Sequence, residues 1–200
     1  MAQQVVLITG ALTGIGRATA VAFASKGAKV VVSGRHDDKG QALVTELRAR
    51  GAEAEFVRAD VTKEDEVRNL VDKAVARFGR LDVAVNNAGV EGELGLIQDA
   101  TVESFRAVLE TNVLGVFLSM KHELRAMAGQ GSGSIVNIAS TYGHKPAAGA
   151  TAYVSSKFAV EGLTKTVRAR AGEFRYSSER SCARCDEHPN GRSLHGHPGS

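Results

Sequence analysis

The sequence predicts an α/β fold of the doubly wound class, in which helices cover both faces of a parallel sheet. Two observations predict it. Short runs rich in Val and Ile alternate with longer amphipathic stretches up to about residue 166, and a glycine-rich turn joins the first run to the first amphipathic stretch. The chain has 200 residues, of which 43% are hydrophobic, so it can form one domain with a core of ordinary size.

The elements follow one another in strict alternation. Strands are expected at residues 5–9, 29–33, 55–59, 83–86 and 134–139, and helices at residues 15–25, 38–50, 63–78, 102–127 and 152–167. Thr62 is predicted to cap the start of the third helix, and Gly27, Gly51 and Gly79 stand where helices end. Because each strand is followed by a helix, the strands are expected to be parallel, with right-handed crossovers.

The composition changes after Thr166. Residues 167–200 contain six Arg and no Lys, both cysteines and three of the six His, and their apolar residues follow neither the helical nor the strand period. We therefore expect a nucleotide-binding domain over residues 1–166 that lacks the last strands of the sheet. The tail over residues 167–200 is expected to be irregular, aberrant and disordered.

A phosphate-binding turn is expected where the first strand meets the first helix. Gly10 suits the tight turn, Gly14 lets backbone N–H groups of Thr13 and Ile15 approach a pyrophosphate, and Gly16 allows close packing of helix on sheet. The helix N-terminus adds about half a positive charge. The spacing is G-x-x-x-G-x-G, which differs from the standard dinucleotide fingerprint.

This glycine motif and several residues after it resemble the short-chain dehydrogenase/reductase family, over Val5 to about Thr166. The further marks are Asp60, Val61, Asn86, Asn87, Ala88, Gly89, Asn112, Ser140, Tyr153 and Lys157. The resemblance implies a Rossmann-type sheet, a nicotinamide cofactor and the interconversion of carbonyl and alcohol. It implies that Asp60 and Val61 border the adenine, and that Asn87, Ala88 and Gly89 lie along the cofactor.

Tyr153 is the candidate acid and base, because carbonyl reduction requires a proton for the developing alkoxide. Lys157 lies one helical turn further, and a cation at about 4 Å supplies roughly the 4 kcal/mol that brings a tyrosine toward neutral pH. Lys157 is also expected to hold the nicotinamide ribose, and Ser140 to donate to the substrate oxygen. The resemblance implies that Asn112 keeps a water beside Lys157.

The second strand favours NADP over NAD. Gly34 stands where an acidic residue would bind the ribose hydroxyl of NAD, and Arg35 follows, whose guanidinium suits a 2′-phosphate. Asp37 and Asp38 leave NAD open, since either carboxylate can reach a hydroxyl and repel a phosphate. Alternatively, these two residues cap the next helix.

Composition excludes several classes of partner. The formal charge of +3 is too slight to indicate nucleic acid, and no apolar run approaches the roughly 18 residues of a membrane span. We therefore expect a cytoplasmic protein with a small carbonyl or alcohol substrate. The resemblance implies a homodimer or homotetramer, paired through the helices that carry Asn112 and Tyr153.

The tail leaves further hypotheses open. Reading its codons one base later permits a phrase that resembles the expected family sequence, so a frameshift near Val167 explains its composition, and we expect weak or no activity from this exact chain. Cys182, Cys185 and His188 have a spacing that suits a zinc site recruiting a partner. A nucleotide-binding protein without catalysis is the remaining alternative.

Overall fold

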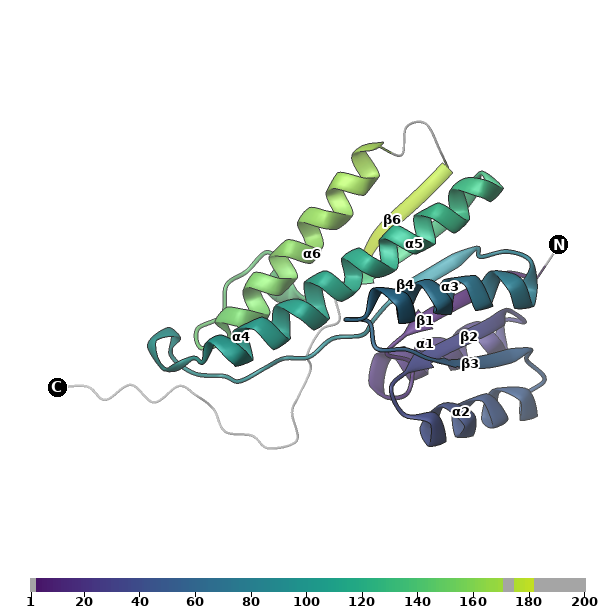
Figure 1. Ribbon diagram of the computed structural model, residues 1–200, viewed down its shortest axis with the longest axis horizontal. Helices are drawn as coiled ribbons and strands as arrows, with labels where there is room; N and C mark the ends of the chain where they lie inside the picture. Colours follow the sequence, from purple (N-terminus) through teal and green to yellow (C-terminus); the bar gives the residue numbers. More distant parts are fainter. Residues whose placement is uncertain (1–2, 171–174, 182–200) are drawn as a thin grey trace.

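The computed structural model describes residues 3–170 and 175–181, and it shows a six-stranded sheet in the order β3-β2-β1-β4-β5-β6 with all neighbours parallel (Figure 1). The strands are β1 Val5–Thr9, β2 Lys29–Gly34, β3 Ala54–Arg58, β4 Val83–Asn86, β5 Ser132–Ile138 and β6 Arg175–Ser181. The order reverses between β1 and β4, which places a crevice at the carboxyl ends of these strands, where ligands of such sheets bind.

Six helices connect the strands. They are α1 Gly14–Ser25, α2 Asp37–Ala49, α3 Glu64–Phe78, α4 Val102–Leu109, α5 Gly115–Gln130 and α6 Thr151–Arg170. The single helix expected over residues 102–127 is continuous but contains a π-helical turn, Glu110–Leu114, between α4 and α5. Such turns often occur at functional sites, and this one carries Asn112. Within the described part of the chain, no helix is both long and apolar enough to cross a bilayer.

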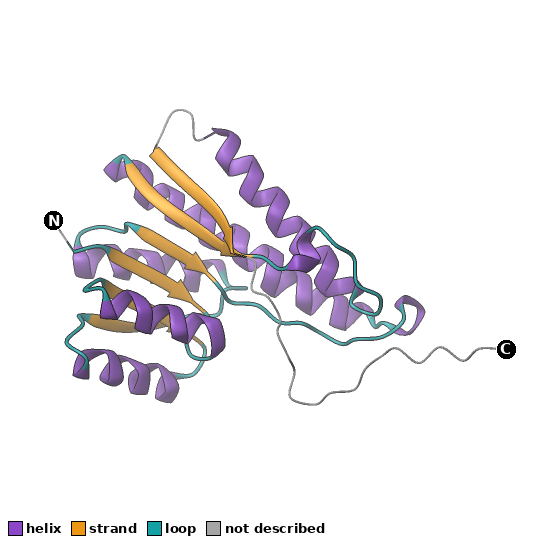
Figure 2. Cartoon of the chain, turned by 180° about the vertical axis from the view of Figure 1, so that it is seen from behind, coloured by secondary structure: helices purple, strands orange, loops and turns teal. Residues whose placement is uncertain are grey.

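The sheet separates two apolar layers. Val6, Ile8 and Val30 pack on the side of α1 and α2, whereas Leu7 and Val31 pack on the side of α3, α5 and α6. This alternation follows from the two-residue period of a strand buried on both faces. In Figure 2 the helices of the first layer stand over β1, β2 and β3, and no helix among the described residues covers that face of β5 and β6.

The fold class is confirmed, and the largest difference from expectation lies after Val167. Helix α6 continues to Arg170, and residues Arg175–Ser181 form β6 parallel to β5, where an irregular tail from Val167 and a sheet without this strand were expected. Strand pairing uses backbone N–H and C=O groups that every residue except proline offers, so this segment pairs without an apolar alternation. The rest of the tail lies outside the described residues.

The helix ends match the expected glycine positions but not the expected cap at Thr62. Gly79 closes α3 in the left-handed conformation with φ of 81°, and Gly27 and Gly51 likewise have positive φ, as expected. The prediction for Thr62 is wrong, because Lys63 is the N-cap of α3. Thr62 instead donates two hydrogen bonds to Asp60 Oδ1, from its backbone nitrogen at 3.0 Å and its hydroxyl at 2.9 Å.

Candidate active site

The turn between β1 and α1 requires its glycines. Gly10 has φ of 61°, and a Cβ there would lie 2.7 Å from the Cα of Ala88. A Cβ on Gly16 would clash with the carbonyl oxygen of Gly10. Gly14 has φ of 52° and open space beside it. Gly10 and Gly16 therefore allow close packing of the backbone, while Gly14 lies at an opening that a ligand can enter.

A cleft of about 440 Å³ lies over this turn at the carboxyl ends of β1, β2 and β4. Thr13 is the N-cap of α1, yet its side chain accepts no backbone hydrogen bond within the described structure, and the first turn of α1 has no acidic residue. The N-terminal N–H groups of α1 are therefore suited to an anion. The cleft is lined by Gly10, Leu12, Thr13, Gly14, Ile15, Gly34, Arg35, His36, Lys39, Ala59, Asp60, Val61, Asn87, Ala88, Gly89, Val90 and Thr111.

Asn87 joins β4 to the glycine turn. Its Nδ2 donates to the carbonyl oxygens of Gly10 at 2.9 Å and Thr9 at 3.3 Å. The hydroxyl of Thr9 accepts in return from the backbone nitrogens of Asn87 at 3.2 Å and Ala88 at 3.3 Å. The side chain of Asn87 thus fixes the shape of the cleft, and sequence reasoning missed the contribution of Thr9.

Basic side chains surround the end of the cleft next to β2. Arg35, His36 and Lys39 all line it, and the sequence analysis identified only Arg35. Asp37 lies in the first turn of α2, with its Oδ2 3.8 Å from Nε of Arg58, and neither Asp37 nor Asp38 is among the lining residues. Both aspartates belong to the first turn of α2, but the N-cap is His36, so neither is the capping residue that the second interpretation expected.

Asp60 and Val61 line the same cleft after β3. Burial opposes ionisation of Asp60, but the hydrogen bonds from Thr62 and the charges of Arg35 and Lys63 outweigh it and hold the pKa of this carboxyl below its ordinary value. Val61 is buried and packs against Val67 of α3 and Leu118 of α5. The pair therefore forms a polar and an apolar wall side by side.

Three of the expected catalytic residues lie after β5 or on α6, namely Ser140, Tyr153 and Lys157. Ser140 is buried just after β5, and its Oγ accepts a hydrogen bond of 3.2 Å from the backbone nitrogen of Tyr142. Because this bond uses the hydroxyl oxygen as acceptor, the hydroxyl proton can be donated to a substrate oxygen. Tyr142 also meets Tyr153 edge to face, with ring centroids 6.3 Å apart, so these two tyrosines pack across the segment between β5 and α6.

Lys157 is only 7% exposed, which is rare for a lysine. Its Nζ donates to the carbonyl oxygen of Ile138 at 2.8 Å and lies 5.4 Å from the ring centroid of Tyr153. Burial lowers the pKa of Lys157 to about 8. The ammonium is therefore largely retained at neutral pH and lies near the ring of Tyr153, as the one-turn spacing predicts.

Asn112 is 1% exposed in the π-helical turn. Its Oδ1 accepts from the backbone nitrogen of Val90 at 2.8 Å, and its Nδ2 donates to the carbonyl oxygen of Val90 at 2.8 Å and to Ser156 Oγ at 3.0 Å. These contacts tie the segment after β4 to α6. The Asn112 side chain is thus hydrogen-bonded to Val90 and Ser156, which indicates a structural role. The resemblance implies a second role, that of holding a water molecule.

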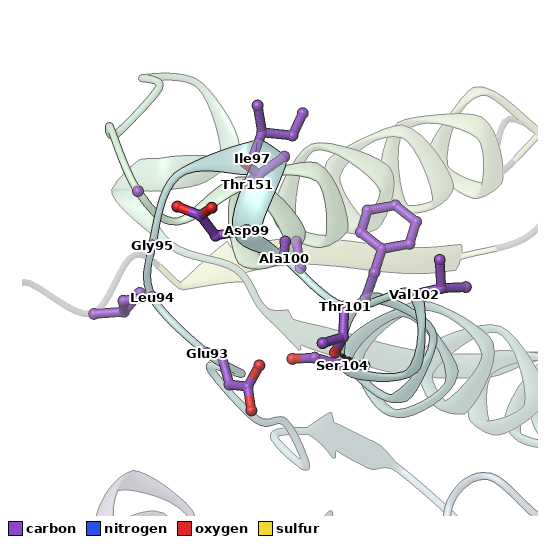
Figure 3. Close-up of a pocket in the computed structure, with 13 residues that line it drawn as sticks. Glu93, Leu94, Gly95, Ile97, Asp99, Ala100, Thr101, Val102, Ser104 and Thr151 are labelled. Atoms are coloured by element: carbon purple, nitrogen blue, oxygen red, sulfur yellow. Dashed lines mark hydrogen bonds between the residues drawn. The ribbon is translucent and has the colours of Figure 1, made fainter.

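A second pocket, of about 280 Å³, lies between the segment after β4 and the start of α6 (Figure 3). Its lining residues include the apolar Leu94, Ile97 and Val102 and the acidic Glu93 and Asp99. The backbone nitrogen of Gly95 donates to the carbonyl oxygen of Gly149 at 2.8 Å and joins its two walls. Ala152, the residue before Tyr153, also lines this pocket.

The zinc hypothesis concerned Cys182, Cys185 and His188, all of which lie outside the described residues. Within residues 3–170 and 175–181, no group of three or more His, Cys, Asp or Glu side chains is arranged to hold a metal ion.

Comparison with known proteins gives a consistent set of relatives. A family model described as short chain dehydrogenase matches residues 4–175. A 3beta-hydroxysteroid dehydrogenase of Mediterraneibacter gnavus is 39% identical over 165 residues, which cover 82% of this chain and 59% of the relative. A (+)-borneol dehydrogenase 2 of Salvia officinalis is 42% identical over 171 residues, covering 85% of this chain and 60% of the relative.

Solved structures agree with these relatives. An actinorhodin polyketide ketoreductase variant with NADPH superposes with a TM-score of 0.86 at 37% identity, covering 90% of this chain and 69% of that one. A short-chain dehydrogenase/reductase from Burkholderia phymatum in complex with NAD also gives a TM-score of 0.86, at 34% identity, covering 90% of this chain and 65% of that one. The chain spans about 60% of the length of the first curated relatives it matches.

Proposed function

The chain belongs to the short-chain dehydrogenase family, and from this premise we propose that it is an NADP-dependent oxidoreductase that interconverts a ketone or aldehyde and an alcohol. One observation carries the proposal. The buried ammonium of Lys157 donates to the carbonyl oxygen of Ile138 and lies 5.4 Å from the ring centroid of Tyr153, at the carboxyl end of β5 and one strand from the cleft over the glycine turn. The cleft has the open glycine turn, and a helix N-terminus without a side-chain cap hydrogen bond, that suit a dinucleotide pyrophosphate.

In this proposal the side chains of the chain carry out the proton transfer, and the cofactor carries out the hydride transfer. When bound, the nicotinamide cofactor supplies or accepts the hydride. Ser140 donates a hydrogen bond to the carbonyl oxygen, and Tyr153 delivers a proton to that oxygen as it becomes an alcohol. Lys157 stabilises the phenolate of Tyr153 that is left, because opposite charges attract strongly in a site of low dielectric. In the reverse direction the phenolate is the base that takes the alcohol proton.

The preference for NADP is supported by charge at the adenosine end of the cleft. Arg35 and Lys39 carry positive charge there, and His36 adds a further hydrogen-bonding group. A guanidinium and an ammonium suit a phosphate monoester, which carries nearly two negative charges at neutral pH. The carboxylate of Asp37 lies near Arg58 in the first turn of α2, and this placement supports NADP further.

The substrate is expected to have an apolar body. The pocket in Figure 3 has an apolar lining and adjoins the start of α6, where Tyr153 lies. The names of two relatives indicate a steroid and a bicyclic alcohol as their substrates. An alicyclic ketone or secondary alcohol therefore matches both the lining and the relatives, and the carboxylates of Glu93 and Asp99 disfavour an anionic body.

The chain is further proposed to form homodimers through α5 and α6. Phe117 and Phe158 on these helices are 48% and 47% exposed, and Leu114 in the preceding π-helical turn is 40% exposed. A shallow apolar groove between the two helices is lined by Val113, Leu114, Phe117, Ala159 and Leu163. Light scattering of the purified chain tests this proposal, and a monomer at micromolar concentration would contradict it.

The experiment for the proposed function is the substitution Tyr153→Phe, with Tyr142→Phe as the matched control. NADPH oxidation by a panel of alicyclic ketones is followed for both variants and for the unaltered chain. Tyr153→Phe is expected to lower kcat about 1,000-fold or more with little change in NADPH affinity, while Tyr142→Phe keeps turnover within about tenfold. Equal turnover of both variants would contradict the assignment. Whether the 200-residue chain turns over as fast as its longer relatives is measured in the same assay, and we expect it to be slower.

A further inference from the structure

Glu123 is a buried acid that the proposed chemistry does not use. It lies on α5 with 0% of its surface exposed, on the layer formed with α3 and β5. Its Oε2 accepts a hydrogen bond of 3.0 Å from Nδ2 of Asn86. Burial raises the pKa of Glu123 to about 7, and the hydrogen bond from Asn86 opposes this only in part.

Glu123 and Asn86 each have one buried oxygen that accepts no hydrogen bond among the described residues. Among the described residues, Oε1 of Glu123 and Oδ1 of Asn86 are buried side-chain atoms without a hydrogen-bond partner. Two acceptors cannot satisfy each other, but a protonated carboxyl has one O–H donor. The two groups are already joined by one hydrogen bond, so a proton on Glu123 allows the second, from its hydroxyl to the amide oxygen of Asn86.

The charged groups on neighbouring elements have other partners. Lys121 and His122, which precede Glu123 on α5, both contact Glu64 of α3, at 2.6 and 3.3 Å. The face of α3 that packs on this layer is apolar, with Leu70, Val71 and Ala74. On α6, Lys157 donates to Ile138, and Glu161 contacts His144 and Lys165. Glu123 therefore has amide and apolar surroundings, which favour its neutral form.

A row of buried polar side chains extends from Glu123 across the sheet. Asn86 of β4 donates to Oδ1 of Asn137 on β5 at 3.0 Å, and Nδ2 of Asn137 donates to Oγ1 of Thr164 on α6 at 2.9 Å. Thr164 in turn donates to the carbonyl oxygen of Val160 at 2.7 Å. Such a row holds amide side chains in one orientation, because each buried donor lost leaves its partner unsatisfied.

Two members of this row directly precede site residues in the sequence. Asn86 precedes Asn87, which holds the carbonyl oxygen of Gly10 in the glycine turn. Asn137 precedes Ile138, whose carbonyl oxygen accepts from Lys157. The orientation of both strand ends therefore depends on the same buried row.

We propose that Glu123 is a positioning residue of the active site, which acts as a neutral carboxylic acid bonded twice to Asn86 and thereby aligns the ends of β4 and β5. This role rests on the proposed function, since the groups it aligns are those assigned to cofactor and proton transfer. Ionisation of Glu123 breaks one of the two bonds and places a charge in the core, which loosens both strand ends.

The test compares Glu123→Gln and Glu123→Leu, with Met127→Leu as control for a packing change at a fully buried position of the same helix. Glutamine offers Asn86 one acceptor and one donor at every pH, whereas leucine offers neither. NADPH affinity, kcat and KM are measured at pH 6.5, and melting temperatures are measured from pH 5 to 8.5.

We expect Glu123→Leu to weaken NADPH binding and lower kcat by about tenfold or more, while Glu123→Gln and Met127→Leu remain within about threefold of the unaltered chain. An acid whose pKa is raised in the fold loses its stabilising contribution as pH rises from its unfolded pKa through its folded pKa. Between about pH 5 and 7 the melting temperature of the unaltered chain should therefore fall by several degrees relative to that of Glu123→Gln. Above that range the difference should level off.

Two results would overturn the inference. One is unchanged NADPH affinity and kcat in Glu123→Leu, and the other is a melting profile of Glu123→Gln parallel to that of the unaltered chain. If Glu123→Leu does not fold, the melting profiles decide. An unaltered chain that binds no NADPH would count against the proposed function alone, because the profiles test Glu123 independently of cofactor.

Discussion

The Nζ atom of Lys157 donates a hydrogen bond of 2.8 Å to the carbonyl oxygen of Ile138, the last residue of β5. This bond joins the helix that carries Tyr153 to the edge of the sheet where the cleft opens. It also gives a buried cation a partner that is not charged, so the charge of Lys157 remains available to a neighbouring phenolate.

The burial of Lys157 predicts a pH effect on stability. Its pKa is lowered to about 8 in the fold, against 10.5 for an ordinary lysine, so between these values the unfolded chain binds a proton that the folded chain does not. The contribution of Lys157 to the free energy of unfolding is fully present above pH 10.5, and it is lost as pH falls from there through about 8. The free energy of unfolding of the unaltered chain should therefore rise relative to Lys157→Met by about 2 kcal/mol between pH 8 and 9.5.

Urea unfolding at several pH values measures this difference. Lys165→Met is the control, because the Lys165 side chain lies two turns further along the same helix and is 68% exposed. A difference between the unaltered chain and Lys157→Met that does not change over this range would refute the assignment of a desolvated ammonium. The rate of ketone reduction is expected to decline above pH 8, as Lys157 loses its charge.

The basic end of the cleft predicts the choice of cofactor. Arg35→Ala and Lys39→Ala are each expected to weaken NADPH binding about 10- to 100-fold and to leave NADH binding nearly unchanged, because only the 2′-phosphate requires their charge. Fluorescence titration with both cofactors measures this. Asp37→Asn is the control and should change neither affinity. A large gain in NADPH affinity in that control would show that Asp37 faces the phosphate.

Close packing at the glycine turn predicts the effect of a single methyl group. In Gly16→Ala the new Cβ meets the carbonyl oxygen of Gly10 and the amide of Asn87, so the turn must shift. We expect a loss of about 1–3 kcal/mol in the free energy of unfolding and weaker binding of NADPH. Gly129→Ala near the end of α5 meets nothing within 4 Å and should be neutral or stabilising by up to about 1 kcal/mol. Equal stability of the two variants would argue against the close approach.

The contact between Glu161 of α6 and His144 is expected to hold the segment after β5 in place. Its carboxylate is buried on α6, with Oε1 3.2 Å from Nδ1 of His144 and Oε2 3.2 Å from Nζ of Lys165. Glu161→Leu removes the contact with His144, so amide exchange over residues 141–150 should speed up and substrate KM should rise about tenfold. Lys165→Ala keeps the contact with His144 and should leave the exchange rates as they are. Unchanged exchange in Glu161→Leu would contradict this role of the carboxylate.

Most of the sheet and the position of the candidate site follow from local sequence patterns. The strand predictions for residues 5–9 and 83–86 match β1 and β4, because a buried strand is a short apolar run with a turn on each side. The glycine spacing and the Tyr153 and Lys157 spacing are also local, so they predicted a turn and a shared helical face. Thr62 shows the limit of such patterns, since its bonds to Asp60 outweigh its tendency to cap a helix.

By itself the sequence determined the fold class and the order of the elements, because hydrophobic period and motif spacing are properties of neighbouring residues. The residues expected to carry the chemistry came from these motifs together with the family resemblance. Only the tertiary structure decided that Lys39 lines the cleft, that Asn112 contacts Val90 and Ser156, and that Glu123 reaches Asn86, 37 residues away. These contacts arise when helices pack on a sheet. Packing selects one orientation of each side chain, whereas the sequence pattern does not distinguish between the possible orientations. The strand β6 depends on the same cause, because the exposed edge of β5 offers backbone partners that no periodicity in residues 175–181 indicates.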